Sequence, residues 1–334
     1  MPAPVVVWFR HDLRLADNPA LTAAVERGAP VVALFVLDEG AMDVWAYGGA
    51  SRWWLHHSLA SLARDLDRRG VELILRRGSA ETALHAIVTK TGAEAVFWNR
   101  LYEPWAVRRD TAIKAHLKDW GAEARSFNGY LLFEPASLRN GRGEPFRVFT
   151  PFWRACLAGE PPPRPLPAPS HLTQGPKAAS ENLDDWKLLP TNPDWAGGLR
   201  ETWVAGETAA REKLRRFCAQ GASRYGAGRD MLGQEGVSRL SPHLQFGEIS
   251  PRQVWHEAQA AVGDAAAPFL RQLGWREFCH HLMFANPDAP EKPLDESFAR
   301  FPWRDDPAAL RAWRRGETEA LEKLGRFCAQ GASR

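Results

Sequence analysis

Short apolar runs alternate with helix-like segments through the first 130 residues, and this alternation constrains the fold more than any other feature of the sequence. The expected strands cover residues 5–9, 31–37, 71–75, 95–98 and 124–127. The expected helices cover residues 18–27, 51–69, 80–91 and 104–120. Continuous apolar strands separated by helices are typical of a parallel, doubly wound sheet. We therefore expect an α/β domain over residues 1–130.

Polar residues follow the expected strands at the edge where the carboxyl ends should meet. They are Arg10-His11-Asp12, Asp38-Glu39, Arg77-Gly78-Ser79 and Asn99-Arg100. Open α/β sheets bind ligands at this edge. No GxGxxG pattern follows the first strand, so the dinucleotide fingerprint is absent there. The adjacent pairs His56-His57 and His280-His281 would point about 100° apart on a helix, so we interpret them as surface or core histidines.

A proline-rich segment separates this region from a second one. Prolines recur from Pro161 to Pro169, which excludes a helix or a central strand and favours an extended tether. Helical patterns dominate beyond residue 209, with helices expected over 252–261, behind the Ser250-Pro251 start signal, and over 268–284. We predict an interdomain linker over 131–205 and an all-α domain over 206–334.

Composition narrows the functional classes without choosing one. A length of 334 residues suits roughly two domains. A net charge of +3 is too small to indicate a nucleic-acid partner by itself. The basic residues are 35 arginines and eight lysines, which favours phosphate binding or else reflects genome composition. The longest apolar run has seven residues, too few for a bilayer, and four cysteines without CxxC spacing indicate a reducing cytoplasm.

Three segments could carry chemistry: residues 8–18, 238–250 and 269–278. The second is a serine–arginine–serine run before a helix, which favours an anion site or, alternatively, a solvated helix start. The third segment places four side chains where a flat ring could lie against one helix face: Phe269, Gln272, Trp275 and Arg276. A core-facing aromatic stripe is the alternative, and spacing alone favours it.

Together with residues 99–110 and 128–135, these segments resemble the DNA photolyase and cryptochrome family over residues 1 to about 316. The resemblance implies an α/β antenna domain, a long linker and a helical domain that holds FAD. It implies a deoxyribodipyrimidine photolyase, a carbon–carbon lyase in which reduced FAD donates an electron under blue light to a pyrimidine dimer. The partner is then damaged DNA with the dimer flipped out of the duplex. The enzyme would act as a monomer in the cytoplasm, without a membrane.

The resemblance also implies roles for individual residues. The FAD contacts would be Tyr225, Val237, Ser238, Arg239, Leu240, Ser241 and Phe269. The DNA contacts would be Arg229, Gln272, Trp275 and Arg276. Trp275 would stack on the flipped lesion. Trp303 matches the outermost tryptophan of the electron-transfer chain that reduces the flavin, and it is the expected catalytic residue.

Several positions depart from the family pattern. Val237 stands where threonine is usual, so one hydroxyl contact is lost. Gln272 stands where dimer-specific photolyases carry glutamate, which leaves the cyclobutane and (6-4) lesions as alternatives. Trp105 and Ala106 replace the polar pair of folate-binding relatives, which argues against methenyltetrahydrofolate and leaves a deazaflavin, another flavin or no second chromophore. A cryptochrome-like photoreceptor without repair activity, and a non-catalytic fragment that binds a chromophore in its α/β domain, are the alternative functions.

The last 19 residues repeat an earlier segment. Residues 316–334 match residues 206–224 at 16 of 19 positions. A repeat protein would show such copies at regular periods, and this copy occurs once. We interpret it as a recombination or assembly artefact on a truncated photolyase. A natural short paralogue that reuses the helix as a cap is the alternative, and either reading predicts weakened FAD binding.

Overall fold

A computed structural model describes residues 2–231 and 233–318 of the chain. They form two compact units, one ending at Asp288 and the other beginning at Ala289. The domain boundaries predicted at residues 130 and 205 both fall inside the first unit and stay a prediction. Across the described ranges, the helices are too short or too polar to cross a lipid bilayer.

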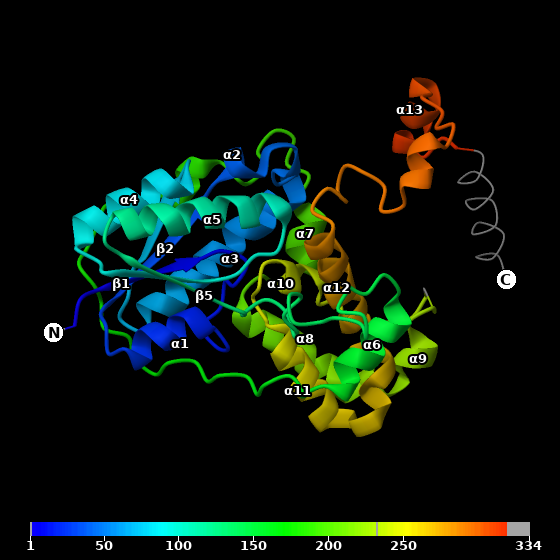
Figure 1. The fold of residues 1–334 in the computed structure, drawn as a ribbon, viewed down its shortest axis with the longest axis horizontal. Coiled ribbons are helices and arrows are strands. Elements are labelled where there is room, and N and C mark those ends of the chain that lie inside the picture. The colour runs from blue at the N-terminus through cyan, green and yellow to red at the C-terminus, as the bar shows by residue number, and fades with distance from the viewer. Residues whose placement is uncertain (1, 232, 319–334) are drawn as a thin grey trace. The chain divides into compact units, whose positions relative to one another are not determined.

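Five parallel strands form one sheet in the first unit, which confirms the predicted α/β fold (Figure 1). They are β1 (Val5–Phe9), β2 (Val31–Leu37), β3 (Leu73–Arg77), β4 (Ala95–Asn99) and β5 (Glu123–Phe127). The order in the sheet is β3-β2-β1-β4-β5, so the winding reverses between β1 and β4. Open sheets of this kind have a crevice at that switch point, beyond the carboxyl ends of the strands.

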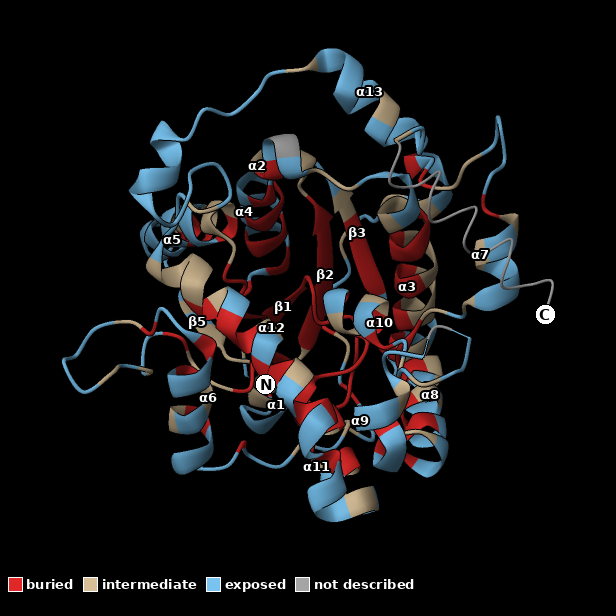
Figure 2. Ribbon diagram, turned by 90° about the vertical axis from the view of Figure 1, so that its right-hand side faces the viewer, coloured by how far each residue is buried: buried red, intermediate tan, exposed pale blue. Residues whose placement is uncertain are grey.

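Helices cover both faces of the sheet because successive side chains of a strand point to opposite faces. They are α1 (Pro19–Glu26), α2 (Glu39–Met42), α3 (Gly49–Asp67), α4 (Ala80–Thr91) and α5 (Pro104–Asp119). Val5, Val7 and Phe9 pack on the side of α1 and α3. Val6 and Trp8 pack on the side of α4 and α5. Figure 2 shows β1 and β2 buried between these layers, and β4 is buried along its length as well, whereas β5 at the edge of the sheet is partly exposed.

The predicted strand at 71–75 is displaced by two residues. Leu73 to Arg77 pair with Ala33 to Leu37 of β2, whereas the amide of Val71 donates to the carbonyl of Leu66 in the preceding helix. The apolar run marked the buried residues, and Val71 is buried without belonging to the ladder. The other predicted elements of this region agree with the structure to within two residues at each end.

The proline-rich segment is extended, as predicted, and the linker that contains it is tied to the sheet region at several points. Leu166 exchanges hydrogen bonds with Asp17, and Gln174 forms a parallel bridge with Val31 at the start of β2. The side chain of Trp186 enters the core on the α1 and α3 side of the sheet. The segment therefore packs on the α/β region and is not a loose tether.

Helices make up most of the remainder of the first unit. The α-helices are α6 (Phe149–Ala158), α7 (Gly197–Thr202), α8 (Glu207–Gln220), α9 (Tyr225–Gly228), α10 (Ser241–Gln245), α11 (Pro251–Val262) and α12 (Ala267–Ala285). Short 3-10 turns are η2 (Leu183–Trp186), η3 (Ala222–Arg224) and η4 (Gly263–Ala266). Ser250 caps α11 through a capping box with Gln253, as the sequence signal predicts. One apolar core joins α8, α11 and α12.

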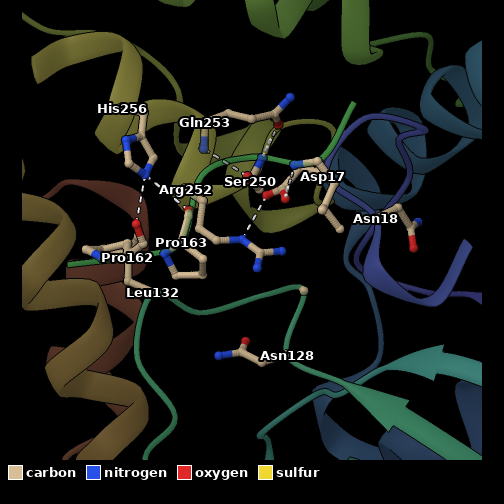
Figure 3. A network of polar contacts seen from close by, with 12 residues as sticks. Asp17, Asn18, Asn128, Leu132, Pro162, Pro163, Ser250, Arg252, Gln253 and His256 are labelled. Carbon is tan, nitrogen blue, oxygen red and sulfur yellow. Dashed lines mark hydrogen bonds and ion pairs between the residues drawn. The ribbon is translucent and has the colours of Figure 1, made fainter. Parts of the chain in front are cut away.

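Polar contacts join the sheet loops to the helical part (Figure 3). The Arg252 Nε donates to Asp17 Oδ2 at 3.0 Å, with the carboxylate fully buried. His256 Nε2 lies 2.9 Å from the carbonyl oxygen of Pro162 in the linker. The amide of Leu13 donates to the carbonyl of Phe246. The contacts of Arg252 and Leu13 fix the loop after β1 against the start of α11 and the loop before it, and the contact of His256 fixes the linker against α11.

The second unit contains the 3-10 turn η5 (Glu296–Arg300) and helix α13 (Pro307–Arg315). None of the residues that the structure describes in this unit is buried. Asp306 caps α13 by accepting from the amides of Ala308 and Ala309. Residues 319–334, which hold most of the second copy of the repeated segment, lie outside the described residues.

Candidate functional site

The first unit contains a cavity of about 620 Å³ between α12 and the loop that leads into α10, which we call the α12 cavity. Binding pockets for drug-sized ligands run from about 300 to 1,000 Å³. All seven residues predicted to contact FAD line it, together with two of the four predicted DNA contacts: Tyr225, Val237, Ser238, Arg239, Leu240, Ser241, Phe269, Gln272 and Arg276. Residues 28 or more positions apart in the sequence, such as Ser241 and Phe269, therefore meet at one site.

The polar wall of the cavity comes from the serine–arginine–serine run. Arg239 has a φ of 52°, the left-handed region that a side chain with Cβ rarely adopts. Its guanidinium is partly exposed and pairs with Glu235 at 3.5 Å. Backbone strain of this kind is found at binding sites, where the surrounding structure holds it in place. The wall offers one cation and two serine hydroxyls to an anionic ligand.

The opposite wall is one face of α12. Its members follow helical spacing, at i, i+3, i+4, i+7 and i+11, and they are Phe269, Gln272, Leu273, Arg276 and His280. Phe269 packs against Phe217 at 4.6 Å and Tyr225 at 5.3 Å between ring centroids. This aromatic corner can bury the flat part of a ligand, while Gln272 and Arg276 present polar groups.

Trp275 does not share this face, which corrects the predicted stripe of four. It lies six positions after Phe269, which turns it about 120° away from the middle of the cavity wall. Its indole stacks instead on Phe149 of α6, at 3.7 Å between centroids and 8° between planes. The side chain is 42% exposed. The spacing argument grouped Trp275 with Arg276, but adjacent helical positions do not point the same way.

Arg276 carries most of the charge on the buried wall. Its Nη1 donates to the carbonyl of Tyr130 at 3.1 Å and lies 3.0 Å from Glu277 Oε1. Its guanidinium carbon lies 4.4 Å from the ring centroid of Tyr130. Its Nη2 is buried and has no hydrogen-bond partner in the described structure. A buried donor without a partner is costly, so this atom marks a place for an acceptor on a ligand.

Glu277 lies behind this arginine and faces away from the cavity. Its Oε2 accepts from the amides of Leu132 and Phe133, so it fixes the loop after β5 to α12. Burial raises the pKa of Glu277 to about 7, against the opposing effects of Arg276 and of these two amides. The carboxyl group therefore holds its proton to a higher pH than an exposed glutamate does.

Tyr130 and His280 line the cavity but were missed by the sequence analysis. Their rings meet at 5.4 Å and 87°. Burial, followed by the charge of Arg276, lowers the pKa of His280 to about 4, so the imidazole is neutral at pH 7. The i+4 spacing of His280 after Arg276 was the signal that could have placed it on this wall, whereas Tyr130 lies on a distant loop and carried no such signal.

Two further predicted residues lie elsewhere. Arg229 is exposed at the end of α9, where its Nε lies 3.5 Å from Asp230 Oδ2, and it does not line the cavity. Trp303 belongs to the second unit and is 71% exposed. Its indole nitrogen donates to the carbonyl of Phe298. The predicted roles of these two residues stay predictions.

A second, smaller pocket lies beyond the carboxyl ends of β1 and β2, and we call it the sheet-edge pocket. Arg10, His11 and Asp38 of the predicted ligand edge line it. The other residues predicted at this edge do not, namely Asp12, Glu39, Arg77 to Ser79 and Asn99-Arg100. Its volume is about 20 Å³, the room of roughly one water molecule. Trp105 lines the pocket, and Tyr47 closes it with a 2.6 Å hydrogen bond to His11.

The arginines of the sheet-edge pocket are held by carboxylates and aromatic rings. Arg10 and Arg109 each lie 4.7 Å from the ring centroid of Trp8. Both pair with Asp110, at 2.6 and 3.0 Å. Burial lowers the pKa of His11, so this ring is neutral at pH 7. The pocket thus has the position of a ligand site and little free space.

Comparison with known proteins supports the interpretation of both regions. The family model described as DNA photolyase matches residues 5–170, and the model described as the FAD binding domain of DNA photolyase matches residues 269–319. Deoxyribodipyrimidine photo-lyase from Agrobacterium fabrum is 46% identical over 322 residues, covering 95% of this chain and 66% of that protein. Cryptochrome-1 from Arabidopsis thaliana is 36% identical, covering 94% of this chain and 48% of that protein.

A solved structure gives the same result. The crystal structure of a bacterial class III photolyase from Agrobacterium tumefaciens has a TM-score of 0.88 and 45% identity, over 95% of this chain and 66% of that one. The chain thus spans about two thirds of the photolyase and about half of the cryptochrome. The sheet, the α12 cavity and these matches together show that the chain belongs to the DNA photolyase and cryptochrome family.

Proposed function

We propose that the α12 cavity holds FAD and that the chain repairs pyrimidine dimers in DNA under blue light, as a photolyase. One observation carries the proposal: the cavity gathers all seven predicted FAD contacts around about 620 Å³ of free space. Bound there, FAD would supply the electron that splits a dimer and take it back afterwards. The relationship to a deoxyribodipyrimidine photo-lyase supports this activity over others.

The residues of the cavity fit the parts of FAD. Arg239 with its neighbouring serines suits a diphosphate, because an arginine fork donates charge-assisted hydrogen bonds to phosphate oxygens. The unpartnered Nη2 of Arg276 offers a further buried donor. Phe269 and Tyr225 form the apolar corner that a flat ring system needs. Val237 lacks a hydroxyl, so its side chain can contribute only van der Waals packing.

For the DNA substrate we propose three roles. Gln272, on the cavity wall, would hydrogen-bond a base edge through its neutral amide, which cannot supply a proton. Trp275 would stack on an extruded base with its exposed ring face. The exposed Arg229 would contact a backbone phosphate. Monomeric action, a cytoplasmic location and the outer electron-transfer role of Trp303 belong to the same proposal.

The sheet-edge pocket is the proposed place for a second chromophore. In the observed conformation it is too small for one, so binding there requires Trp105 or Tyr47 to move. A chain with FAD as its single chromophore is the alternative. The amount and absorption of the chromophores released from the purified protein separate the two, since a second chromophore would add either a band that FAD lacks or more than one flavin per chain.

The test begins with the chain reconstituted with FAD and then reduced. Repair of an oligonucleotide with one thymine dimer should require both blue light and FAD, and it should stop in the dark. Arg239→Gln should weaken FAD binding roughly tenfold or more, because it removes a charged hydrogen-bond donor. The matched control is Arg216→Gln, an exposed arginine of α8 that lines none of the pockets described above. FAD binding that resists the first substitution, or is lost equally with the second, contradicts the proposal.

A cryptochrome-like photoreceptor is the second candidate. The neutral Gln272 and the 36% identity to Cryptochrome-1 favour it. The repair assay distinguishes the candidates, because a photoreceptor would bind FAD at the same cavity and respond to light without splitting the dimer.

A further inference from the structure

Trp275 stacks on an aromatic side chain, that of Phe149, which the sequence analysis did not identify. The indole lies face to face with the ring of Phe149, the first residue of α6, at 3.7 Å and 8°. Phe149 is buried, whereas Trp275 is 42% exposed. One face of the indole is therefore covered by protein and the opposite side of the ring is turned to solvent.

The ring of Phe149 is held rigidly because α6 and α12 pack closely around it. Phe149 contacts the edge of Phe278 at 5.8 Å and 73°. The guanidinium of Arg271 lies 5.4 Å from the same phenylalanine ring. At Gly274 an added Cβ would lie 2.5 Å from the ring of Trp153, so the two helices approach as closely as glycine allows. Phe149 therefore has little freedom to turn away from Trp275.

We propose that Phe149 is a positioning residue, which fixes the plane of Trp275 so that the indole receives a base on its outer face only. This inference rests on the proposed function, because it assigns Trp275 to an extruded base. A tryptophan side chain without a supporting ring such as Phe149 would exchange among rotamers, and it would lose conformational freedom when DNA binds. Phe149 removes that cost in advance, which strengthens stacking without touching the DNA.

The first measurement reads the indole directly and needs no DNA. The emission of Trp275 is the difference between the chain and its Trp275→Phe variant, and acrylamide quenching reports its accessibility. Phe149→Leu should raise the quenching constant about twofold, since it opens the second ring face and frees the side chain. Phe149→Tyr, which keeps the ring, should leave the constant unchanged.

Phe152→Leu is the matched control for loss of core packing. Phe152 lies on the same helix, is fully buried and contacts Phe278 and His281, with no recorded ring contact to Trp275. It should reduce the thermal midpoint about as much as Phe149→Leu without changing the quenching of Trp275. An unchanged constant in Phe149→Leu, or an equal rise in Phe152→Leu, overturns the positioning role.

The second measurement is the ratio of affinities for a single-stranded oligonucleotide with one thymine dimer and for its undamaged copy. Phe149→Leu should lower this ratio about fivefold. Phe149→Tyr, which keeps the ring, and Phe152→Leu should both leave the ratio at its wild-type value. A wild-type chain that shows no preference for the dimer refutes the proposed function, and the quenching result then decides the positioning role alone. A wild-type preference that survives Phe149→Leu intact refutes the inference and leaves the proposed function standing.

Discussion

The sheet-edge pocket and the α12 cavity lie in the same compact unit and differ in the free space beside their buried charged groups. Arg10 and Arg109 of the first share the carboxylate of Asp110 and lie on the ring of Trp8. Arg276 of the second keeps a buried nitrogen without a partner beside about 620 Å³ of free space. The contrast shows that position at the switch point of a sheet does not by itself make a binding site. A buried donor without a partner does not make one either, because Arg10 Nε in the sheet-edge pocket also lacks a partner. Free volume is needed as well.

The two sites are joined through the loop between α10 and α11, and breaking this link should have the largest effect. Gly247 has a φ of 66°, and a Cβ there would collide with the carbonyl oxygen of His11 in the sheet-edge pocket. Gly247→Ala should lower the free energy of unfolding by about 3 kcal/mol or more, as measured by chemical denaturation. Gly92→Ala, also at positive φ but in the left-handed helical region and in open space, should cost only about 1 kcal/mol. Equal losses would show that backbone strain, and not the contact with His11, decides the cost.

A smaller effect should come from the buried carboxyl behind the α12 cavity. The folded-state pKa of Glu277 is raised to about 7, so the folded chain holds this proton more tightly than the unfolded chain. Its contribution to stability is complete below the unfolded pKa and is lost as the pH rises through 7. Between pH 5 and pH 8 the wild type should lose roughly 2 kcal/mol relative to Glu277→Gln.

The comparison of Glu277→Gln with the wild type is made at each pH, because other groups titrate in both proteins. His280 is one of them: burial lowers its pKa to about 4, so its contribution is lost as the pH falls through that value. That slope is shared by the two proteins and cancels in the difference. A difference that stays constant from pH 5 to pH 8 contradicts the raised pKa of Glu277.

The smallest expected effect sharpens the contrast between a filled and an open site. Phe269→Leu should weaken FAD binding about fivefold, because it keeps most of the apolar volume but removes the ring that packs with Tyr225. Trp105→Leu, at the sheet-edge pocket, should leave the FAD dissociation constant unchanged. Isothermal titration of the chain with FAD measures both. If Trp105→Leu weakens binding equally, the two sites are not separate.

Local patterns were sufficient to predict the sheet. Strands such as 5–9 and 31–37 are continuous apolar runs, and glycines such as Gly92 end the helices between them. The family resemblance, which spans distant segments, was needed to predict that the serine–arginine–serine run and Phe269 belong to one site. Spacing along α12 does separate Trp275 from the cavity wall, because six positions of about 100° each turn it about 120° from Phe269, and the predicted stripe of four overlooked this turn.

What the sequence could not supply were contacts between segments far apart in the chain. Tyr130 meets Arg276 across 146 residues, and Phe149 meets Trp275 across 126. Neither aromatic residue belongs to a periodic pattern that indicates its partner. The size of the sheet-edge pocket was also beyond prediction, because it depends on the rotamers of Trp105 and Tyr47.

The extended segment after α6 has a consequence for how such proteins are assembled from parts. Trp186 and Leu188 complete the apolar layer beneath the sheet, although the sequence places them among residues that connect two domains. A shuffled gene that ended the sheet region at residue 130 would encode a layer with part of its cover missing. The unit that can be exchanged between related genes is therefore the sheet together with the extended segment after α6. Exchange should give a folded protein where the crossover point lies beyond Ala196.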